Sequence, residues 1–514
     1  MGQLILFFSV LISVSLAGKP CLPRHTGGET VVCVCNATYC DFLDAISDQQ
    51  VSGTAFLLFE TSEAGLRLHR TQGKRSAGSR ATATTTLTVD RAQTFQEMLG
   101  FGAALTDSAA LNIMKLNQVT RHNLLRTYFG EGGSNYLYLR VPMASCDFSE
   151  TYYSYDDVKG DVELKHFSLT KNDVYYKVPI VKEASQLRGQ EIKLFASPWS
   201  APYWMKINGT TKGISRLNES YYQVWANYFV KFFEAYKLHG VTFWGVNPQN
   251  EPSQGQRTPS SIPSMGWTED QMKKFVGQNL GPTLHRSGFG GLKLMNLDDN
   301  RSNLPGFADA VLADAEAKKY SSGISVHWYT DSWNSVNALR KTHSDHPDQF
   351  LFYTEACVIT TLTPAVMGSW VAIGERYMNS MFQALNNWVV GWTDWNMALN
   401  EQGGPKNVGD HMTYYGYPAS VLVNASAQEF YKLSSYYVQA HFSSFIPPGS
   451  KRVQLDLSGD NTLLNVAFLT PQGRIVVVLA NQSDQQKTVV ISEKAKAHIS
   501  VTVQKRSINT IIYK

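Results

Sequence analysis

Residues 243–252 read FWGVNPQNEP, an apolar run that ends in polar side chains with a glutamate directly after it. Seven further runs of this kind occur, and stretches with helical spacing lie between them, for example 221–236 and 375–388. Continuous apolar runs separated by helices are typical of parallel strands that are covered on both faces. The eight runs are 98–104, 136–143, 192–197, 243–250, 292–297, 324–329, 350–355 and 389–396.

Eight strand–helix repeats predict an α/β fold, a closed (β/α)8 TIM barrel. An open, doubly wound sheet is the alternative, but no glycine-rich phosphate fingerprint follows any of the runs. In a (β/α)8 barrel the active site lies at the carboxyl ends of the strands. The residues that end the eight runs are therefore the candidates for function.

The pattern changes beyond about residue 430, where short runs rich in β-branched residues alternate with turn signals. Segments 54–59 and 82–89 have the same character, so we expect an accessory β-sandwich formed from both ends of the chain. The expected domains are a signal peptide (1–18), a small disulfide-bearing N-terminal β module (19–45 with 397–430), the sandwich (46–94 with 431–514) and the catalytic barrel (95–396).

Several features near the N-terminus predict export. An apolar run over 4–16 followed by Ala17 and Gly18 is typical of a signal peptide. Four cysteines within 20 residues then predict two disulfides, and their pairing stays open: Cys21, Cys33, Cys35 and Cys40. Zinc binding is the alternative, but the spacing does not match the usual paired motifs.

Acceptor motifs for N-glycosylation occur six times, at Asn36, Asn208, Asn218, Asn300, Asn424 and Asn481. With a signal peptide they predict a glycoprotein that is secreted or delivered to the lysosome. The net charge of +4 is spread without a dense basic run, which argues against nucleic-acid binding. No later stretch is apolar enough to span a bilayer.

Two glutamates, Glu251 and Glu355, stand at the ends of the fourth and seventh runs. The run ends hold neither a metal-ligand cluster nor a Gly-x-Ser-x-Gly elbow, so we expect no metal and no cofactor. Paired carboxylates are what glycoside hydrolysis requires, since one carboxyl protonates the leaving oxygen and the other attacks the anomeric carbon. The sequence therefore predicts a β-glycosidase-like site.

Other residues at the run ends are candidates for substrate binding. Asn250 suits a sugar 2-hydroxyl. Trp199 and Trp395 are platforms for sugar rings or, alternatively, packing at the barrel rim. Asp147 binds hydroxyls or caps a helix. Arg140 and His327 orient Glu355 or are buried structural partners, and Tyr329 is a further candidate for substrate binding.

Ten stretches in order along the chain carry a family resemblance. They are CVCNATYCD at 33–41, GFGAALTDSAALNI at 100–113, RVPMASCDFS at 140–149, ASPWSAPYWMKING at 196–209, NEPS at 250–253, GPTL at 281–284, HWY at 327–329, TEAC at 354–357, VVGWTDWN at 389–396 and FSSFIPPGS at 442–450. With these motifs the chain resembles glycoside hydrolase family 30, and within it the lysosomal glucosylceramidases.

The resemblance implies hydrolysis of glucosylceramide to glucose and ceramide with retention, with Glu251 as acid/base and Glu355 as nucleophile. It implies glucose contacts from Asp147, Trp199, Asn250 and Trp395. It also implies disulfides Cys21–Cys33 and Cys35–Cys40, with Cys146 and Cys357 free. For partners it implies a membrane surface with anionic lipid, a saposin-type activator and a lysosomal membrane-protein receptor.

The sequence departs from the family pattern in three places. The stretch 404–424 is longer than the usual loop, Pro248-Gln249 is unusual before Asn250, and the glycan motifs differ except at Asn36. The rival hypotheses are a retaining glycosidase that acts on another β-glucoside or a β-linked polysaccharide, and a non-catalytic glycoprotein that binds glycans or lipid. The loop at 404–424 is where the aglycone preference would change.

Overall fold

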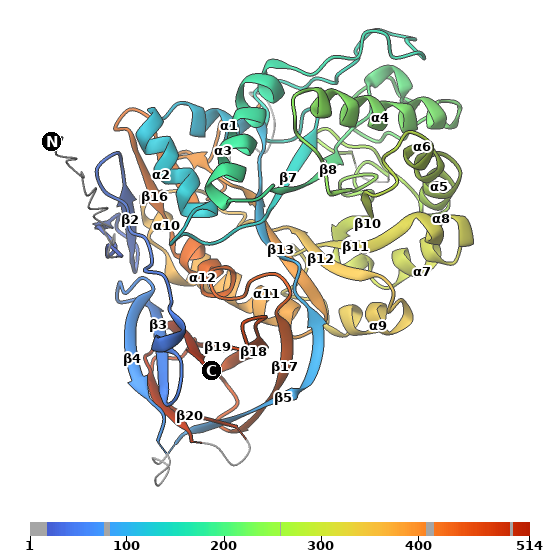
Figure 1. Ribbon diagram of the computed structural model, residues 1–514. Coiled ribbons are helices and arrows are strands. Elements are labelled where there is room, and N and C mark those ends of the chain that lie inside the picture. Colours follow the sequence, from blue (N-terminus) through green and yellow to red (C-terminus); the bar gives the residue numbers. More distant parts are fainter. Residues whose placement is uncertain (1–17, 77–82, 257–258, 408–415, 494–496) are drawn as a thin grey trace, which may run out of the picture.

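The computed structural model describes residues 18–76, 83–256, 259–407, 416–493 and 497–514 (Figure 1). The expected signal peptide therefore lies, except for Gly18, outside the described residues. Within the described ranges, no helix combines the length and the apolar character needed to cross a membrane.

Eight parallel strands close into a barrel in the order β10-β11-β12-β13-β6-β7-β8-β9. Pairing of β13 with β6 closes the ring, which confirms the predicted (β/α)8 barrel and excludes the open sheet. The strands are β6 (Gly100–Ala104), β7 (Tyr138–Met143), β8 (Lys193–Pro198), β9 (Gly245–Val246), β10 (Lys293–Asn300), β11 (Ser321–His327), β12 (Phe350–Glu355) and β13 (Val389–Asn396).

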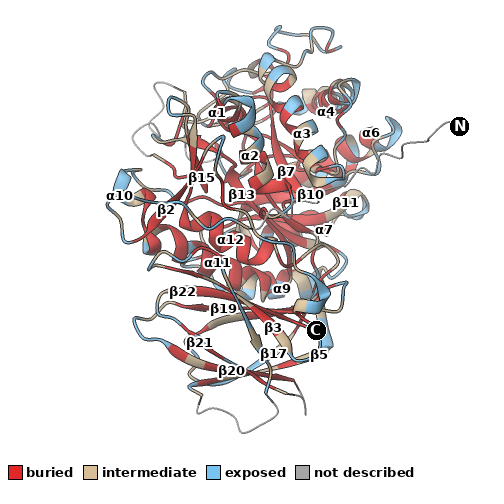
Figure 2. Cartoon of the chain, turned by 60° about the vertical axis from the view of Figure 1, so that its left-hand side comes forward, coloured by how far each residue is buried: buried red, intermediate tan, exposed pale blue. Residues whose placement is uncertain are grey.

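Helices surround the barrel and bury their apolar faces against it (Figure 2). In α4, Trp225, Phe229 and Phe232 recur at helical spacing and are fully buried. The helices are α1 (Asp107–Met114), α2 (Gln118–Phe129), α3 (Val178–Arg188), α4 (Tyr222–Leu238), α5 (Glu269–Lys274), α6 (Gly281–Arg286), α7 (Gly306–Leu312), α8 (Ala315–Tyr320), α9 (Asn337–Asp345), α10 (Pro364–Met367), α11 (Arg376–Leu385) and α12 (Ser434–Ser443).

The accessory domain is a nine-stranded sheet built from both ends of the chain (Figure 1). Its last strand in sequence pairs with β19 on one side and with β3 on the other. Phe56, Leu87, Val489 and Ile499 share one buried core, so the sheet folds over itself. In sheet order the strands are β21 (Ile499–Val503), β20 (Lys487–Glu493), β5 (Thr85–Glu97), β17 (Lys451–Gly459), β18 (Leu464–Leu469), β19 (Ile475–Asn481), β22 (Ser507–Tyr513), β3 (Ala55–Ser62) and β4 (His69–Lys74).

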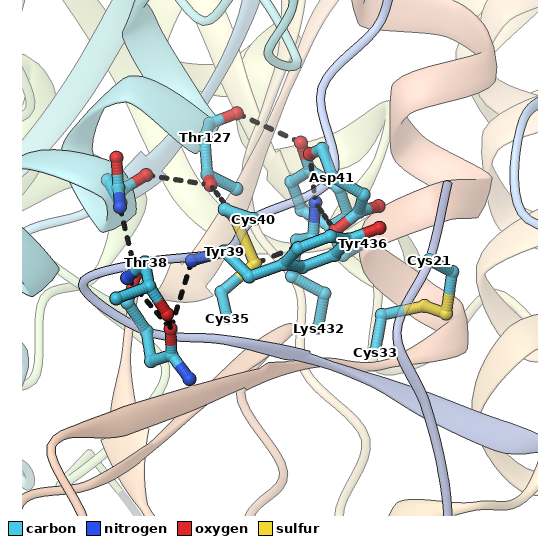
Figure 3. The surroundings of a disulfide bond; sticks show 12 residues. Cys21, Cys33, Cys35, Thr38, Tyr39, Cys40, Asp41, Thr127, Lys432 and Tyr436 are labelled. Carbon is cyan, nitrogen blue, oxygen red and sulfur yellow. Dashed lines mark hydrogen bonds and ion pairs between the residues drawn. A yellow bond between two sulfur atoms is a disulfide. The ribbon is translucent and has the colours of Figure 1, made fainter. Parts of the chain in front are cut away.

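A third, five-stranded sheet joins the N-terminal segment to the chain after the barrel. Disulfides Cys21–Cys33 and Cys35–Cys40 confirm the pairing that the resemblance implied, and Cys146 and Cys357 are free and buried. Beside the second disulfide, Lys432 forms a buried ion pair with Asp41 (Figure 3). The strands are β1 (Pro23–His25), β2 (Val31–Cys35), β16 (Glu429–Lys432), β15 (Val421–Asn424) and β14 (Leu399–Asn400).

The glycosylation motifs differ in accessibility. Asn208 and Asn218 are exposed, and three others are half-buried: Asn36, Asn300 and Asn424. Asn481 is only 1% exposed, and its amide nitrogen donates to the carbonyls of Gln485 and Gln504. Asn481 is therefore the least accessible of the six acceptors in the folded chain. All six acceptors stay predictions.

Candidate active site

The two glutamates meet at the carboxyl end of the barrel. Glu355 is the last residue of β12, and Glu251 follows the loop after β9. A carboxylate oxygen of Glu251 lies within 4.8 Å of one from Glu355. Glu251 has a left-handed backbone, with φ of +42°, and its N–H donates to the carbonyl of Asp298 at 2.8 Å. Such strain in a non-glycine residue is typical of functional sites.

Both carboxylate oxygens of Glu355 are held by the protein. Arg140, at the centre of β7, donates from Nη1 to Oε2, and the Tyr329 hydroxyl donates to Oε1 at 2.6 Å. The Arg140 side chain is 0% exposed, so its charge acts on Glu355 with little screening by water. Glu355 thus has a fixed orientation and a permanent cation beside it.

A buried carboxylate that we did not predict lies at the centre of this cluster. Asp298, on β10, accepts hydrogen bonds at Oδ2 from Arg140 at 2.7 Å and from Ser197 at 2.5 Å. Its Oδ1 accepts from Thr354 at 2.7 Å and lies 3.1 Å from Nε2 of His327. Burial by itself would raise the pKa of Asp298, but Arg140 and His327 hold it well below its ordinary value.

His327 connects the two glutamates with Asp298. Its Nδ1 lies 3.3 Å from Oε1 of Glu251 and 3.9 Å from Oε1 of Glu355. Burial by itself lowers the pKa of His327, but the charges of Glu355 and Asp298 outweigh it and raise the pKa to about 10. The ring is therefore an imidazolium that donates from both nitrogens.

The proton on His327 also decides whether this cluster suits a metal. Ligand atoms of Glu251, His327 and Glu355 lie close enough together to surround a cation. A metal needs a free lone pair on the imidazole, however, and an imidazolium has none. In the protonated form His327 presents an N–H donor to Glu251 and another to Asp298, so the three side chains form a hydrogen-bonded acid–base cluster.

Hydrogen bonds with neighbouring buried residues fix the segment before Glu251. Asn250 accepts at Oδ1 from Nη2 of Arg140 at 2.7 Å, and no described residue accepts from its amide hydrogens, which suits a ligand. Gln249 donates to the carbonyls of Trp199 and Asn250 at 2.8 and 2.9 Å, and accepts from Trp267. The unusual Gln249 is thus a buried support for the strand-end residues.

Trp199 and Trp395 form one wall of the site. Their rings stack on each other, with centroids 5.2 Å apart and planes at 19°, and they are 2% and 1% exposed. The guanidinium carbon of Arg140 lies 4.8 and 5.1 Å from the two ring centroids. Since each indole covers one face of the other, only the remaining faces and edges are left for a sugar.

Asp147 lies in the loop after β7. No described helix begins at Asp147, so the helix-cap alternative is excluded within the described part of the chain. Burial, followed by the charge of Glu355, raises the pKa of Asp147 to about 7, and Lys406 opposes this shift. The Oδ1 of Asp147 is buried without a hydrogen-bond partner in the described structure, which suits a ligand hydroxyl.

The long segment after Gly403 approaches the site from the side of Asp147. Nζ of Lys406 lies 3.8 Å from the ring centroid of Tyr417 and 5.1 Å from that of Phe148. Residues 408–415 of this segment lie outside the described residues. The described ends of the segment therefore lie beside Phe148, the residue that follows Asp147.

Comparison with known families identifies the chain. The family model described as "Glycosyl hydrolase family 30 TIM-barrel domain" matches residues 98–446, and the model of the family's beta sandwich domain matches residues 449–511. This chain belongs to glycoside hydrolase family 30. As a family 30 member with two opposed carboxyl groups in a barrel, it is a retaining glycoside hydrolase.

Relatives within family 30 cover almost the whole chain. "Lysosomal acid glucosylceramidase" of Mus musculus is 39% identical over 100% of this chain and 99% of its own length. "Putative glucosylceramidase 4" of Caenorhabditis elegans is 40% identical over 94% of this chain and 93% of its own length. The crystal structure of SrfJ from Salmonella typhimurium superposes with a TM-score of 0.82 at 26% identity, covering 90% of this chain and 99% of SrfJ.

Proposed function

We propose that this chain hydrolyses glucosylceramide to glucose and ceramide by double displacement. The observation that carries the proposal is the short separation of Glu251 and Glu355, which have carboxylate oxygens within 4.8 Å of each other. Retaining enzymes place the two groups about 5–5.5 Å apart, whereas inverting enzymes need about 6.5–9.5 Å. The glucosylceramidases among its relatives support the choice of substrate.

In the first displacement Glu355 attacks the anomeric carbon of the glucose unit. Glu251 donates its proton to the glycosidic oxygen, the carbon–oxygen bond breaks, and ceramide leaves with its hydroxyl restored. Arg140 and Tyr329 hold Glu355 in position for attack, and the His327 imidazolium orients Glu251. A covalent glucosyl ester on Glu355 is the result.

In the second displacement water hydrolyses the glucosyl ester on Glu355. Glu251, now a carboxylate, takes a proton from the water, which attacks the anomeric carbon from the side that ceramide left. Glucose departs with its original β configuration, and Glu355 is again a carboxylate. Two inversions thus give net retention.

Glucose recognition rests on residues around this pair. We assign the 2-hydroxyl to the free amide hydrogens of Asn250 and another hydroxyl to the unpartnered oxygen of Asp147. Trp199 and Trp395 bound the sugar ring. Because Arg140 and His327 are fully buried and occupied by carboxylates, their part is to fix the charges, not to contact the sugar.

The proposal extends to location and partners. A lysosomal relative, the expected signal peptide over 1–18 and the glycan motifs support delivery to the lysosome, with secretion as the alternative. The substrate lies in a membrane surface, where anionic lipid, a saposin-type activator and a lysosomal membrane-protein receptor are the expected partners. The domain limits expected from the sequence are kept in this proposal, with the barrel as the catalytic domain.

Mechanism-based labelling tests the chemistry. A glucose-configured inactivator is expected to label Glu355, and peptide mapping identifies the modified residue. Substrate profiling tests the aglycone, with glucosylceramide compared against β-glucan and xylan. Turnover of a polysaccharide without turnover of glucosylceramide would refute the lipid assignment, and a chain without any turnover would be a binding glycoprotein.

A further inference from the structure

A buried ion pair lies behind the loop that carries Asp147. Lys177 closes a π-helical segment, η2 (Asn172–Lys177), and its Nζ lies 2.7 Å from Oδ1 of Asp107 and 3.4 Å from Oδ1 of Asp173. All three side chains are buried. Burial alone would lower the pKa of Lys177, but Asp107 and Asp173 raise it, so the amine keeps its charge.

The second oxygen of Asp107 holds the chain on one side of Asp147. Ser149 donates from its hydroxyl to Oδ2 of Asp107 at 2.6 Å, and the same hydroxyl accepts from the backbone N–H of Cys146 at 3.1 Å. Tyr153 also donates to this carboxylate oxygen, at 2.9 Å. The charge of Lys177 thus orients a carboxylate that fixes the residue before Asp147.

The first turn of α1 holds the chain on the other side. The N–H and the hydroxyl of Ser108 both donate to the carbonyl of Phe148, at 3.0 and 2.8 Å. The Pro405 carbonyl lies close to the same hydroxyl and shares its one hydrogen with the Phe148 carbonyl, and Asn112 donates to the carbonyl of Gly404 at 2.9 Å. One helix start therefore anchors both the Asp147 loop and the beginning of the long segment after Gly403.

We propose that Asp107, paired with Lys177, is a positioning residue that places Asp147 for glucose binding through Ser149, while Ser108 fixes the opposite flank. This inference rests on the proposed function of Asp147 as a glucose contact. Among the described contacts Asp107 reaches Lys177, Ser149 and Tyr153 and neither of the two glutamates, so its effect reaches the substrate through the loop. Asp107 therefore controls the binding of glucose and not the chemical step.

Ser149→Ala is the mildest test, because it cuts the link and leaves the ion pair intact. A contact made equally in the ground state and the transition state changes KM and leaves kcat unchanged. For an aryl β-glucoside we expect KM to rise about tenfold, the loss of one good hydrogen bond, with kcat within about twofold. Ser134→Ala is the matched control: Ser134 is equally buried but precedes β7, at the opposite end of the barrel, and should change neither constant.

Asp107→Asn tests the ion pair itself and should raise KM at least as much as Ser149→Ala. The substitution leaves Asp173 as the one carboxylate of this ion pair, so the midpoint of thermal unfolding of the variant should also fall. Should this variant not fold, Ser149→Ala and Ser108→Ala still decide the proposal. An unchanged KM in folded Ser149→Ala overturns it.

The background Asp147→Ala separates this proposal from the function on which it rests. If Ser149 acts through Asp147, Ser149→Ala changes KM by less than about twofold once Asp147 is absent, because the two residues serve one contact. A tenfold effect that persists in that background overturns the positioning role. An unchanged KM in Asp147→Ala alone refutes the glucose contact itself, which is a different and recognisable result.

Discussion

Asparagine in place of Asp298 removes one negative charge from the buried cluster with Arg140 and His327 while keeping the shape of the side chain. In the folded chain the pKa of His327 is about 10, against an ordinary value of 6.5. At about 1.4 kcal/mol for each pKa unit, this difference corresponds to about 5 kcal/mol of stabilisation. The charges of Glu355 and Asp298 are the two main causes of the raised pKa of His327, so we assign about half of this stabilisation to Asp298.

The pH dependence follows from the direction of the shift. Because the pKa of His327 is raised on folding, its stabilisation is complete below about pH 6.5 and is lost as the pH rises towards about 10. Asp298 has a lowered pKa, so its stabilisation persists down to pH values below its ordinary range. The cluster should therefore be strongest in mildly acidic solution.

The expected result is a destabilisation of about 3–5 kcal/mol by Asp298→Asn at pH 5.5, the usual effect of breaking a buried pair. At pH 9 the penalty should be smaller by about 1–2 kcal/mol, because the wild type has already lost most of the contribution from His327. Denaturant unfolding followed by tryptophan fluorescence measures both values.

Asp299→Asn provides the matched control for this measurement. Asp299 is a buried neighbour on the same strand, but its described partners are Ser253 and Asn300, and none of them is a cation. Its penalty should not depend on pH between 5.5 and 9. A penalty for Asp298→Asn that is equal or larger at pH 9 would refute the coupling between Asp298 and His327.

Four further outcomes are expected from kinetics. Glu355→Gln should lower kcat on an aryl β-glucoside by at least about 10³-fold, since the nucleophile is lost. Turnover as fast as that of the wild type would refute the mechanism. Glu251→Gln should impair glucosylceramide more than a dinitrophenyl glucoside, whose leaving group needs no proton; equal losses on the two substrates would contradict its role as acid. Tyr329→Phe should reduce kcat about tenfold through the lost hydrogen bond to Glu355, with KM little changed. Asp147→Asn should resemble the wild type more closely at pH 5 than at pH 8, because the pKa of Asp147 is about 7 and its carboxyl is neutral in acid; a pH-independent ratio of kcat/KM values speaks against this.

The barrel could be predicted because its strands are buried on both faces and so read as continuous apolar runs. The apolar pattern predicts the ends of those strands less accurately. The predicted run 292–297 stopped one residue before Asp298, because β10 continues into polar residues up to Asn300. The predicted run 243–250 shrinks to Gly245–Val246, since Pro248 has no N–H for a ladder.

Contacts between distant segments explain what the sequence did not reveal. Strand β2 pairs with β16, about 400 residues away, with Cys35 opposite Phe430, and no local pattern indicates such a partner. The link from Lys177 through Asp107 to the Asp147 loop likewise joins three separate segments. The catalytic candidates and two of the buried charges beside them, Arg140 and His327, were recognisable by their type at strand ends, whereas Asp298, which joins those two charges, was not.

The pairing of β22 with β3 has a consequence for synthesis. Residues 507–513 lie between β19 and β3 in the sheet, yet they are synthesised some 450 residues after β3. The early strand must therefore wait, with its hydrogen-bonding edge unsatisfied, through the translation of the entire barrel. A stop codon just before residue 507 would leave that edge of β3 unpaired in a molecule whose two glutamates are intact.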